Sequence, residues 1–244
     1  MYSKILVPLD GSKTAEEVLP IVRRLSESQQ IPVELLGVVD VSGATIQLAA
    51  DRARYLEGLL EAGENSLKEY LAKIATTFGN VAVNCVVERG RAADVIIARA
   101  AANDKTLIAI ASHGWSGLRR WLLGSVAEKV LRGTKNQVFL ARAQDSEGLR
   151  SDLGLKSVIV PLDGSTLAEC VLAAAVKFAE TLDLEIVLFR AYELPATAYY
   201  GSENYLPDYD ALKKEVEIEA RNYLEAQAAA LHARGLTQVR IVVA

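Results

Sequence analysis

One hexapeptide occurs twice in the sequence, and this repeat is the feature that most constrains how the chain can fold. VPLDGS occupies residues 7–12 and, 153 positions later, residues 160–165. The similarity extends over KILVPLDGSKTAEEVL in the first copy and SVIVPLDGSTLAECVL in the second. Because a repeat of this kind indicates a repeated structural unit, the chain is predicted to contain two related units.

Later segments of the two units also correspond, in residue type rather than in identity. The sequence VELLGVVDV at 33–41 matches LEIVLFRAY at 184–192, and a long helical pattern follows each of them. VNCVVE at 83–88 then matches VRIVVA at 239–244. The order of these matches predicts that both units begin with the same succession of elements.

Short apolar segments alternate with longer helical patterns along the chain. The short segments are rich in Val, Ile and Leu, which is typical of strands buried on both faces. Strands are predicted at 4–9, 33–39, 81–87, 106–111, 137–142, 157–162, 184–189 and 239–243. Helices are predicted near 14–28, 47–77, 91–103, 124–133, 166–181 and 207–234. This alternation predicts an α/β fold built on an open parallel sheet with helices on both faces.

Local signals mark the first helix of each unit. Thr14 and Thr166 are each followed by Glu three residues later, a pattern that predicts a helix start. Pro20 lies inside the predicted helix at 14–28 and is expected to bend it or loosen its first turns.

The second unit has no counterpart of residues 89–142, so its predicted sheet is incomplete. We expect a complete first domain at 1–143, a polar linker at 144–155 and a partial second domain at 156–244. An incomplete sheet leaves a backbone edge unpaired. Either the chain is a truncated form, or another chain completes the sheet.

Composition excludes several classes of function. The net charge is −4, and Lys and Arg form no cluster of the kind that binds nucleic acid. No apolar run approaches the roughly 18 residues of a membrane span, and the N-terminus has no secretory pattern. Cys85 and Cys170 lie in apolar segments and are expected to be buried free thiols in a reducing cytoplasm. The predicted location is therefore cytoplasmic.

The segment IAIASHGWSGLRRWLLGSVAEKVLR, at 108–132, carries the strongest functional signal. It leaves an apolar strand, passes through a loop containing glycine and enters a helix after Gly124. The free N–H groups and the positive dipole end of such a helix can bind a phosphate. Ser125 would add a hydroxyl donor. Asp10 follows the first strand and would face the same crevice, at the carboxyl ends of the strands.

Structural interpretations remain open for both polar residues. Ser125 and Glu128 match a capping box, in which Ser125 would be the N-cap of the helix. Asp10 is a typical turn residue that can bond its own backbone, whereas as a ligand group it would accept from a ribose hydroxyl. Two common phosphate fingerprints, G-x-x-x-x-G-K-[ST] and G-x-G-x-x-G, are absent from the sequence.

Together these motifs resemble the universal stress protein family, in a tandem form with a truncated second domain. The nucleotide motif of that family is glycine, two residues, glycine, nine residues, and glycine followed by Ser or Thr. Gly114 matches the second glycine and Gly124–Ser125 match the end, whereas Ala111 stands at the first position. The resemblance implies five parallel strands in the order 3-2-1-4-5, followed by an incomplete second copy, and some members of the family bind ATP.

The resemblance also implies a set of nucleotide-binding residues. Pro8, Leu9 and Asp10 would flank adenine and ribose, and Val38 would touch the base. Further contacts to ribose and phosphates would come from Ser112, His113, Gly114, Gly124, Ser125, Val126 and Ala127. No catalytic residue or metal ligand is implied, although Mg²⁺ could accompany the phosphates. Homodimers are expected to form through strand 137–142 or through the incomplete second domain.

The leading hypothesis is an ATP-binding stress-response regulator or nucleotide sensor with at most slow hydrolysis, because no general base is evident. One alternative is a family member that binds no nucleotide and acts through protein contacts, which Ala111 favours. Another alternative is an adenine-nucleotide-dependent activating enzyme, although the DGS turn is shorter than the loop such enzymes use. No nucleic acid or membrane partner is predicted.

Overall fold

The computed structural model describes residues 2–41, 50–112, 124–142, 155–193 and 209–244. The chain divides into two compact units, Met1–Leu153 and Gly154–Ala244. Each unit is built on its own parallel sheet.

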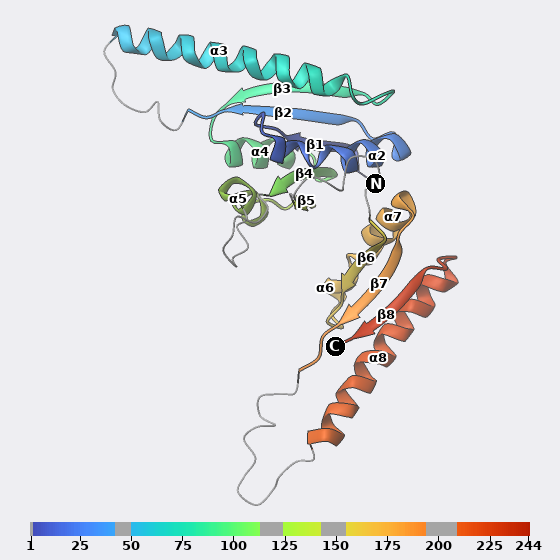
Figure 1. The fold of residues 1–244 in the computed structure, drawn as a ribbon. Helices are drawn as coiled ribbons and strands as arrows, with labels where there is room; N and C mark the ends of the chain where they lie inside the picture. The colour runs from blue at the N-terminus through green and yellow to red at the C-terminus, as the bar shows by residue number, and fades with distance from the viewer. Residues whose placement is uncertain (1, 42–49, 113–123, 143–154, 194–208) are drawn as a thin grey trace, which may run out of the picture. The chain divides into compact units, whose positions relative to one another are not determined.

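The first unit contains five parallel strands with helices on both faces (Figure 1). Its elements follow the order β1 (Lys4–Pro8), α1 (Lys13–Glu16), α2 (Leu19–Gln29), β2 (Val33–Val39), α3 (Ala50–Ala75), β3 (Val83–Arg89), α4 (Ala92–Ala101), β4 (Thr106–Ser112), α5 (Ser125–Gly133) and β5 (Val138–Arg142). The strand order is β3-β2-β1-β4-β5, which confirms the predicted 3-2-1-4-5 topology.

Apolar side chains fill the space between this sheet and its helices. Leu6, Leu36 and Ile108 from the strands pack against Ile96 of α4 and Val130 of α5. Because these residues are almost completely removed from water, their burial supplies the main driving force for this half of the unit. The helices α4 and α5 therefore share one face of the sheet, and α3 packs over Gly37 on the other face.

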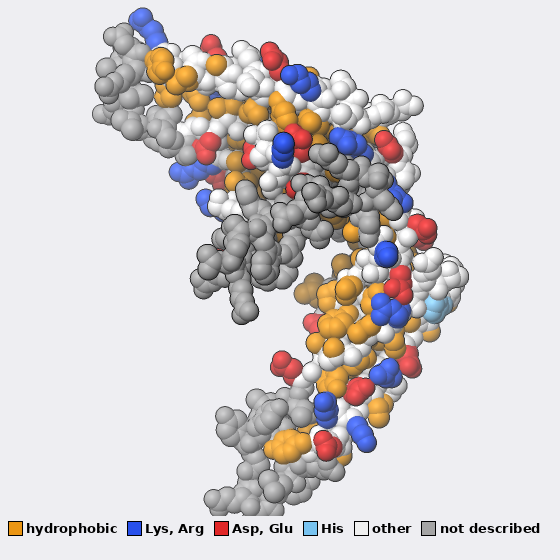
Figure 2. Space-filling view, in the orientation of Figure 1, with side chains coloured by type: hydrophobic (Ala, Val, Ile, Leu, Met, Phe, Trp, Pro, Cys, Tyr) orange, Lys and Arg blue, Asp and Glu red, His pale blue; other side chains and the backbone are white. Residues whose placement is uncertain are grey.

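The second unit contains three parallel strands in the order β6-β7-β8. Its elements are β6 (Ser157–Pro161), α6 (Thr166–Glu169), α7 (Leu172–Leu182), β7 (Glu185–Arg190), α8 (Tyr209–Ala233) and β8 (Val239–Val243). This arrangement fits an incomplete second copy of the first unit, as predicted. Hydrophobic side chains are visible on the surface of this unit (Figure 2), and Ile159 on β6 is 63% exposed.

Strand pairing corrects the predicted alignment of the second strands. Ile5 pairs with Val33, and Val158 pairs with Ile186, so these partners keep the repeat distance of 153 residues. The alignment of 33–41 with 184–192 is therefore wrong by two residues. The physical reason is that strands buried on both faces lack polar–apolar alternation, so residue type alone does not fix their register.

Helix boundaries differ from prediction at the start of each unit. The predicted helix at 14–28 is split into α1 and α2, and the one at 166–181 is split into α6 and α7. Pro20 is not the common cause, because Ala173 occupies the corresponding position in the second unit. The N-caps are Ser12 and Ser165, whose hydroxyls each accept from a backbone N–H at 3.1 Å, so neither Thr14 nor Thr166 caps its helix. The predicted helix start at Thr166 agrees with the first residue of α6, whereas α1 begins one residue before Thr14.

The cysteines are free thiols, but both are exposed, so the prediction of burial is wrong. Cys85 lies on β3, an edge strand of the five-stranded sheet, and Cys170 follows the short helix α6. An edge strand and a helix end offer fewer covering neighbours than the apolar sequence around them suggested.

No helix in the described ranges combines the length and apolar character needed to cross a bilayer.

Candidate functional site

A pocket of about 160 Å³ opens in the first unit where the strands β1, β2 and β4 end. Helix α4 forms one wall, and the N-terminus of α5 forms another. The lining residues are Pro8, Leu9, Asp10, Ala15, Leu36, Val38, Ala92, Ile96, Ile110, Ala111, Gly124, Ser125, Val126 and Ala127. Pockets for drug-sized ligands span about 300–1,000 Å³, so this one would enclose part of such a ligand, for example a flat ring system.

Most of the predicted binding residues meet at this pocket. Its lining includes the predicted Pro8, Leu9, Asp10, Val38, Gly124, Ser125, Val126 and Ala127. Ser112 is not among the lining residues, because its side chain is buried and its hydroxyl donates to the carbonyl oxygen of Ala141 at 3.4 Å. His113 and Gly114 lie outside the described residues.

The N-terminus of α5 corrects the capping-box interpretation. Gly124 is the N-cap of this helix, with φ −54° and ψ 146°, and no side chain caps it. Ser125 is already helical, and the carboxylate of Glu128 pairs with Arg132 at 3.0 Å. A serine caps a helix only from the non-helical residue before its first turn. Ser125 is one position too late for that, so its exposed hydroxyl is not engaged as an N-cap.

The same helix end presents backbone donors to the pocket. The first N–H groups of an α-helix have no acceptor within the helix, and Ser125, Val126 and Ala127 all line the pocket. The positive end of the helix dipole adds to this effect. The arrangement can therefore hold an anion without a lysine or arginine, and neither residue type is among the lining residues described.

Asp10 lies in the turn that follows β1, one residue beyond Leu9. One of its carboxylate oxygens accepts from the backbone N–H of Ser12 at 2.9 Å, across Gly11, whose φ is +84°. Asp10 is exposed and also lines the pocket, so a turn role and a ligand role are compatible in the same side chain. A carboxylate in this position can accept from a hydroxyl of a bound ligand.

Apolar walls of the pocket include residues that the sequence did not single out. Leu36 is the middle residue of β2, Ile110 lies toward the carboxyl end of β4, and Ala92 and Ile96 come from α4. The strand residues were open to prediction, because ligands in such folds bind at the carboxyl ends of strands. The contribution of α4 was not, because it depends on how that helix packs on the sheet.

Ala111 occupies an ordinary strand position beside the pocket. It lies in β4, where it pairs with Ala141 of β5, and it lines the opening with its neighbour Ile110. The replacement of a motif glycine by alanine therefore requires no unusual backbone conformation at this place.

Asp10 is the single ionisable side chain among the described lining residues. Across the described parts of the chain, no group of three or more His, Cys, Asp or Glu residues could hold a metal ion. The pocket thus combines an apolar slot, one carboxylate and an anion-binding helix end. Groups of these kinds are suited to holding a ligand with an apolar part and an anionic part.

Comparison with known proteins gives a consistent result. A sequence model of the Universal stress protein family matches residues 1–142. A universal stress protein of Methanocaldococcus jannaschii is 32% identical over 149 residues, which are 60% of this chain and 86% of that protein. Universal stress protein YxiE of Bacillus subtilis is 26% identical over 148 residues, which are 58% of this chain and 100% of that protein.

Among solved structures, a universal stress protein from Archaeoglobus fulgidus resembles the fold with a TM-score of 0.66. The match covers 100% of this chain and 78% of that chain at 17% sequence identity. At this identity the likeness concerns the fold alone.

Proposed function

This chain belongs to the universal stress protein family, and from that premise we propose that it binds an adenine nucleotide, ATP in the first place, in the pocket of its first unit. As a stress-response protein it would act as a regulator or nucleotide sensor. The observation that carries the proposal is that Asp10 and the N-terminus of α5, far apart in sequence, line one pocket.

Each wall of the pocket suits a different part of the nucleotide. The apolar slot between Leu36, Val38 and Ile96 would take the flat base. Asp10 would accept a hydrogen bond from a ribose hydroxyl, and the N–H groups at Ser125 to Ala127 would donate to the phosphates. Ser112, His113 and Gly114 remain proposed neighbours of ribose and phosphates.

The proposed mechanism is binding rather than efficient catalysis. A general base for hydrolysis must lie within reach of the attacking water and have a suitable pKa. Asp10 is the one ionisable group among the described lining residues, and its proposed partner is the ribose. We therefore propose at most slow hydrolysis. Mg²⁺ could accompany the phosphates, although the described lining offers no set of ligands for it.

A titration with ATP tests the phosphate site. The Gly124→Ala, Ser125→Ala double variant should bind ATP about tenfold or more weakly than the wild-type chain, which corresponds to about 1.4 kcal/mol. Alanine is compatible with the backbone of Gly124, at φ −54°, so the fold should persist. Circular dichroism would verify this, and equal affinities in the two folded proteins would refute the assigned site.

Ala111 supports a second candidate, a family member that binds no nucleotide and acts through protein contacts. Its methyl group adds bulk at the pocket, where the family motif has glycine. The ratio of absorbance at 260 and 280 nm of the purified protein, followed by mass analysis of any released ligand, separates the two candidates. No bound nucleotide, together with no thermal shift on adding ATP, AMP or cyclic AMP, would favour this one.

We also propose a complete domain at 1–143, a linker at 144–155, a partial domain at 156–244, and a cytoplasmic location for the protein.

We further propose a homodimer through β5. The proposal is supported by the position of β5 at the edge of the sheet, where it has one neighbouring strand. Light scattering on the wild type and on a Phe139→Pro variant, which removes one backbone donor from that strand, would test the dimer.

A further inference from the structure

A chain of hydrogen bonds leads from helix α3 to Asp10. The hydroxyl of Tyr70 on α3 donates to Glu16 of α1 at 2.9 Å. The backbone N–H groups of Glu16 and Ala15 bond to the carbonyl and hydroxyl oxygens of Ser12 at 3.3 Å and 3.1 Å. The N–H of Ser12 in turn donates to the Asp10 carboxylate at 2.9 Å. Three consecutive hydrogen bonds, Tyr70 to Glu16, Glu16 to Ser12 and Ser12 to Asp10, therefore connect Tyr70 to a residue of the pocket.

Tyr70 itself is not part of the pocket lining, and it is partly buried. Burial, followed by the hydrogen bond to Glu16 and the charges of Glu16 and Asp10, raises the pKa of its hydroxyl. The hydroxyl therefore keeps its proton at neutral pH and remains a donor to Glu16. Ala15, in the same short helix as Glu16, lines the pocket with Asp10, so the position of α1 affects two pocket residues.

The second unit contains the same series of hydrogen bonds, between residues that lie 153 positions later in the sequence. Tyr223 of α8 donates to Glu169 at 2.9 Å, and the hydroxyl of Ser165 accepts from Ala168 at 3.1 Å. The N–H of Ser165 donates to Asp163 at 2.8 Å. The tyrosines thus correspond as closely as the VPLDGS segments do, although they lie in long helices whose sequences otherwise diverge.

Surroundings of the two aspartates differ. Asp163 lies near Arg190, whose charge contributes to a lowered pKa of the Asp163 carboxyl after the hydrogen bonds with Ser165. The residue at the position of Arg190 in the first unit is Gly37, which has no side chain to approach Asp10. The series of bonds is thus common to both units, and in the first unit it ends at a pocket that includes the N-terminus of α5.

We propose that Tyr70 and Glu16 are positioning residues that hold α1 in place. Through Ser12 they also fix the orientation in which the Asp10 carboxylate accepts a hydrogen bond from a ribose hydroxyl. This inference rests on the proposed nucleotide site and adds to it two residues that do not touch the ligand. It also assigns the effect to one part of the ligand, the ribose, rather than to the phosphates.

Matched tyrosine variants of the full chain provide the first test. Tyr70→Phe should weaken ATP binding about fivefold to tenfold, since the bond to a charged acceptor is lost and the carboxylate is held less firmly. Tyr223→Phe removes the equivalent bond in the second unit and should leave ATP affinity unchanged. Calorimetric titration measures both affinities. Equal affinities of the wild type and Tyr70→Phe would overturn the inference.

Ribose analogues distinguish positioning from general loosening. One of the two deoxy analogues, 2′-deoxy-ATP or 3′-deoxy-ATP, lacks the hydroxyl that donates a hydrogen bond to Asp10. The wild type should bind ATP more tightly than that analogue, and Tyr70→Phe should lose most of this preference. If Tyr70→Phe weakens ATP and both deoxy analogues by the same factor, the role is structural and the inference fails. Glu16→Gln keeps an acceptor for Tyr70 and should retain more affinity than Glu16→Ala.

Failure of the inference can be separated from failure of the proposed function. A wild-type chain that binds none of these nucleotides overturns both. A wild-type chain that binds ATP, with loss of affinity in the Gly124→Ala, Ser125→Ala variant but none in Tyr70→Phe, supports the proposed site and overturns the inference alone.

Discussion

At the scale of single residues, the two copies of VPLDGS adopt the same local structure in different surroundings. Asp10 and Asp163 each accept from the backbone N–H of the serine two residues later, across a glycine with positive φ. A carboxylate beside glycine in this turn is therefore explained by local structure alone. The difference arises from the neighbours, because Asp10 lines a pocket and Asp163 lies near Arg190.

This difference predicts unequal effects of one substitution in the two copies. Asp10→Ala should weaken ATP binding about tenfold, consistent with loss of a charged hydrogen-bond acceptor. Asp163→Ala, its matched control, should leave ATP affinity at the wild-type value while disturbing an identical turn. Isothermal titration would measure both. A comparable loss in the two variants would mean that the turn rather than the pocket controls binding.

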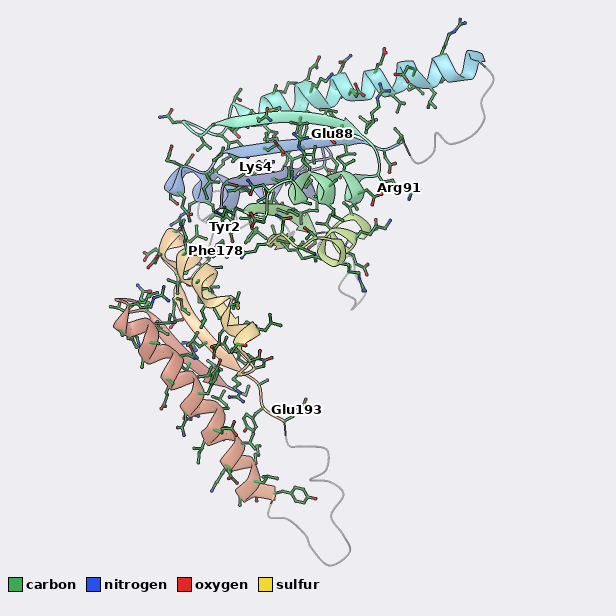
Figure 3. All side chains as sticks on the ribbon, turned by 180° about the vertical axis from the view of Figure 1, so that it is seen from behind. Tyr2, Lys4, Glu88, Arg91, Phe178 and Glu193 are labelled. Carbon is green, nitrogen blue, oxygen red and sulfur yellow. The ribbon has the colours of Figure 1, made fainter. Side chains whose placement is uncertain are left out.

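At the scale of elements, one ionic cluster ties three strands and a helix of the first unit together. Glu34 on β2, whose side chain is 9% exposed, pairs with Lys4 on β1 at 3.0 Å and with Arg99 on α4 at 2.6 Å. Arg99 also pairs with Glu88 on β3. Lys4 and Glu88 lie on the strands of the sheet, as Figure 3 shows. A cluster of this kind holds α4, and hence one wall of the pocket, against the sheet.

The contribution of this cluster to the free energy of unfolding should decrease at acidic pH. Burial raises the pKa of Glu34, but the hydrogen bonds from Arg99 and Lys4 outweigh that effect, so the pKa lies below its ordinary value of 4.5. A depressed pKa in the folded state stabilises the fold above the unfolded pKa, and this contribution is lost as the pH falls through the folded pKa. Glu34→Gln should therefore cost about 1–3 kcal/mol at pH 7 and progressively less below about pH 4.5.

Urea unfolding at pH 7 and at a series of acidic pH values would measure this dependence. Glu128→Gln provides the control, because Glu128 pairs with Arg132 on the surface of one helix and such pairs contribute about 0.2–1 kcal/mol. A cost for Glu34→Gln that stays constant from pH 7 down to pH 3 would contradict the assignment.

At the scale of the whole molecule, the two units carry the same first elements but differ in how their sheets are covered. In the first unit, α4 and α5 cover the face on which Leu36 and Ile108 pack. The second unit has counterparts of α1, α2 and α3 but, among the described residues, none of α4 or α5. Accordingly Ile159, Leu167 and Val171 are 63%, 82% and 46% exposed. A reader can see apolar side chains on this unit in Figure 2.

Truncation of an apolar side chain in the second unit should lower the free energy of unfolding less where the side chain is more exposed. Ile159→Ala should change the free energy of unfolding by less than about 0.5 kcal/mol, as most surface substitutions do. Leu188→Ala, at a residue that is 0% exposed, should cost about 2–5 kcal/mol. Guanidinium unfolding monitored by circular dichroism compares them. A cost of 2 kcal/mol or more for Ile159→Ala would show that this face is covered in solution.

Much of this architecture could be predicted, because buried strands and helix periodicity produce patterns among residues that are close together in the sequence. Runs such as ILVP and LIAIA are apolar throughout, which marks strands covered on both faces. The predicted bounds of β2 and β8 agree with the structure, and the others differ by a few residues. Where apolar patterns were uniform, as around β7, prediction of the register failed, since nothing in such a pattern distinguishes one register from its neighbours.

For the candidate site, the backbone features that a ligand would meet could be predicted from residue types and their spacing. The aspartate after β1 and the glycine–serine pair that begins α5 are chemical signals readable without coordinates. Tertiary structure alone decided that these segments line one pocket, that Ser125 is not a cap, that α4 supplies a wall and that Tyr70 bonds to Glu16. The physical reason is that strand and helix signals arise between neighbours in the chain, whereas a pocket arises from side chains that packing brings together across the fold.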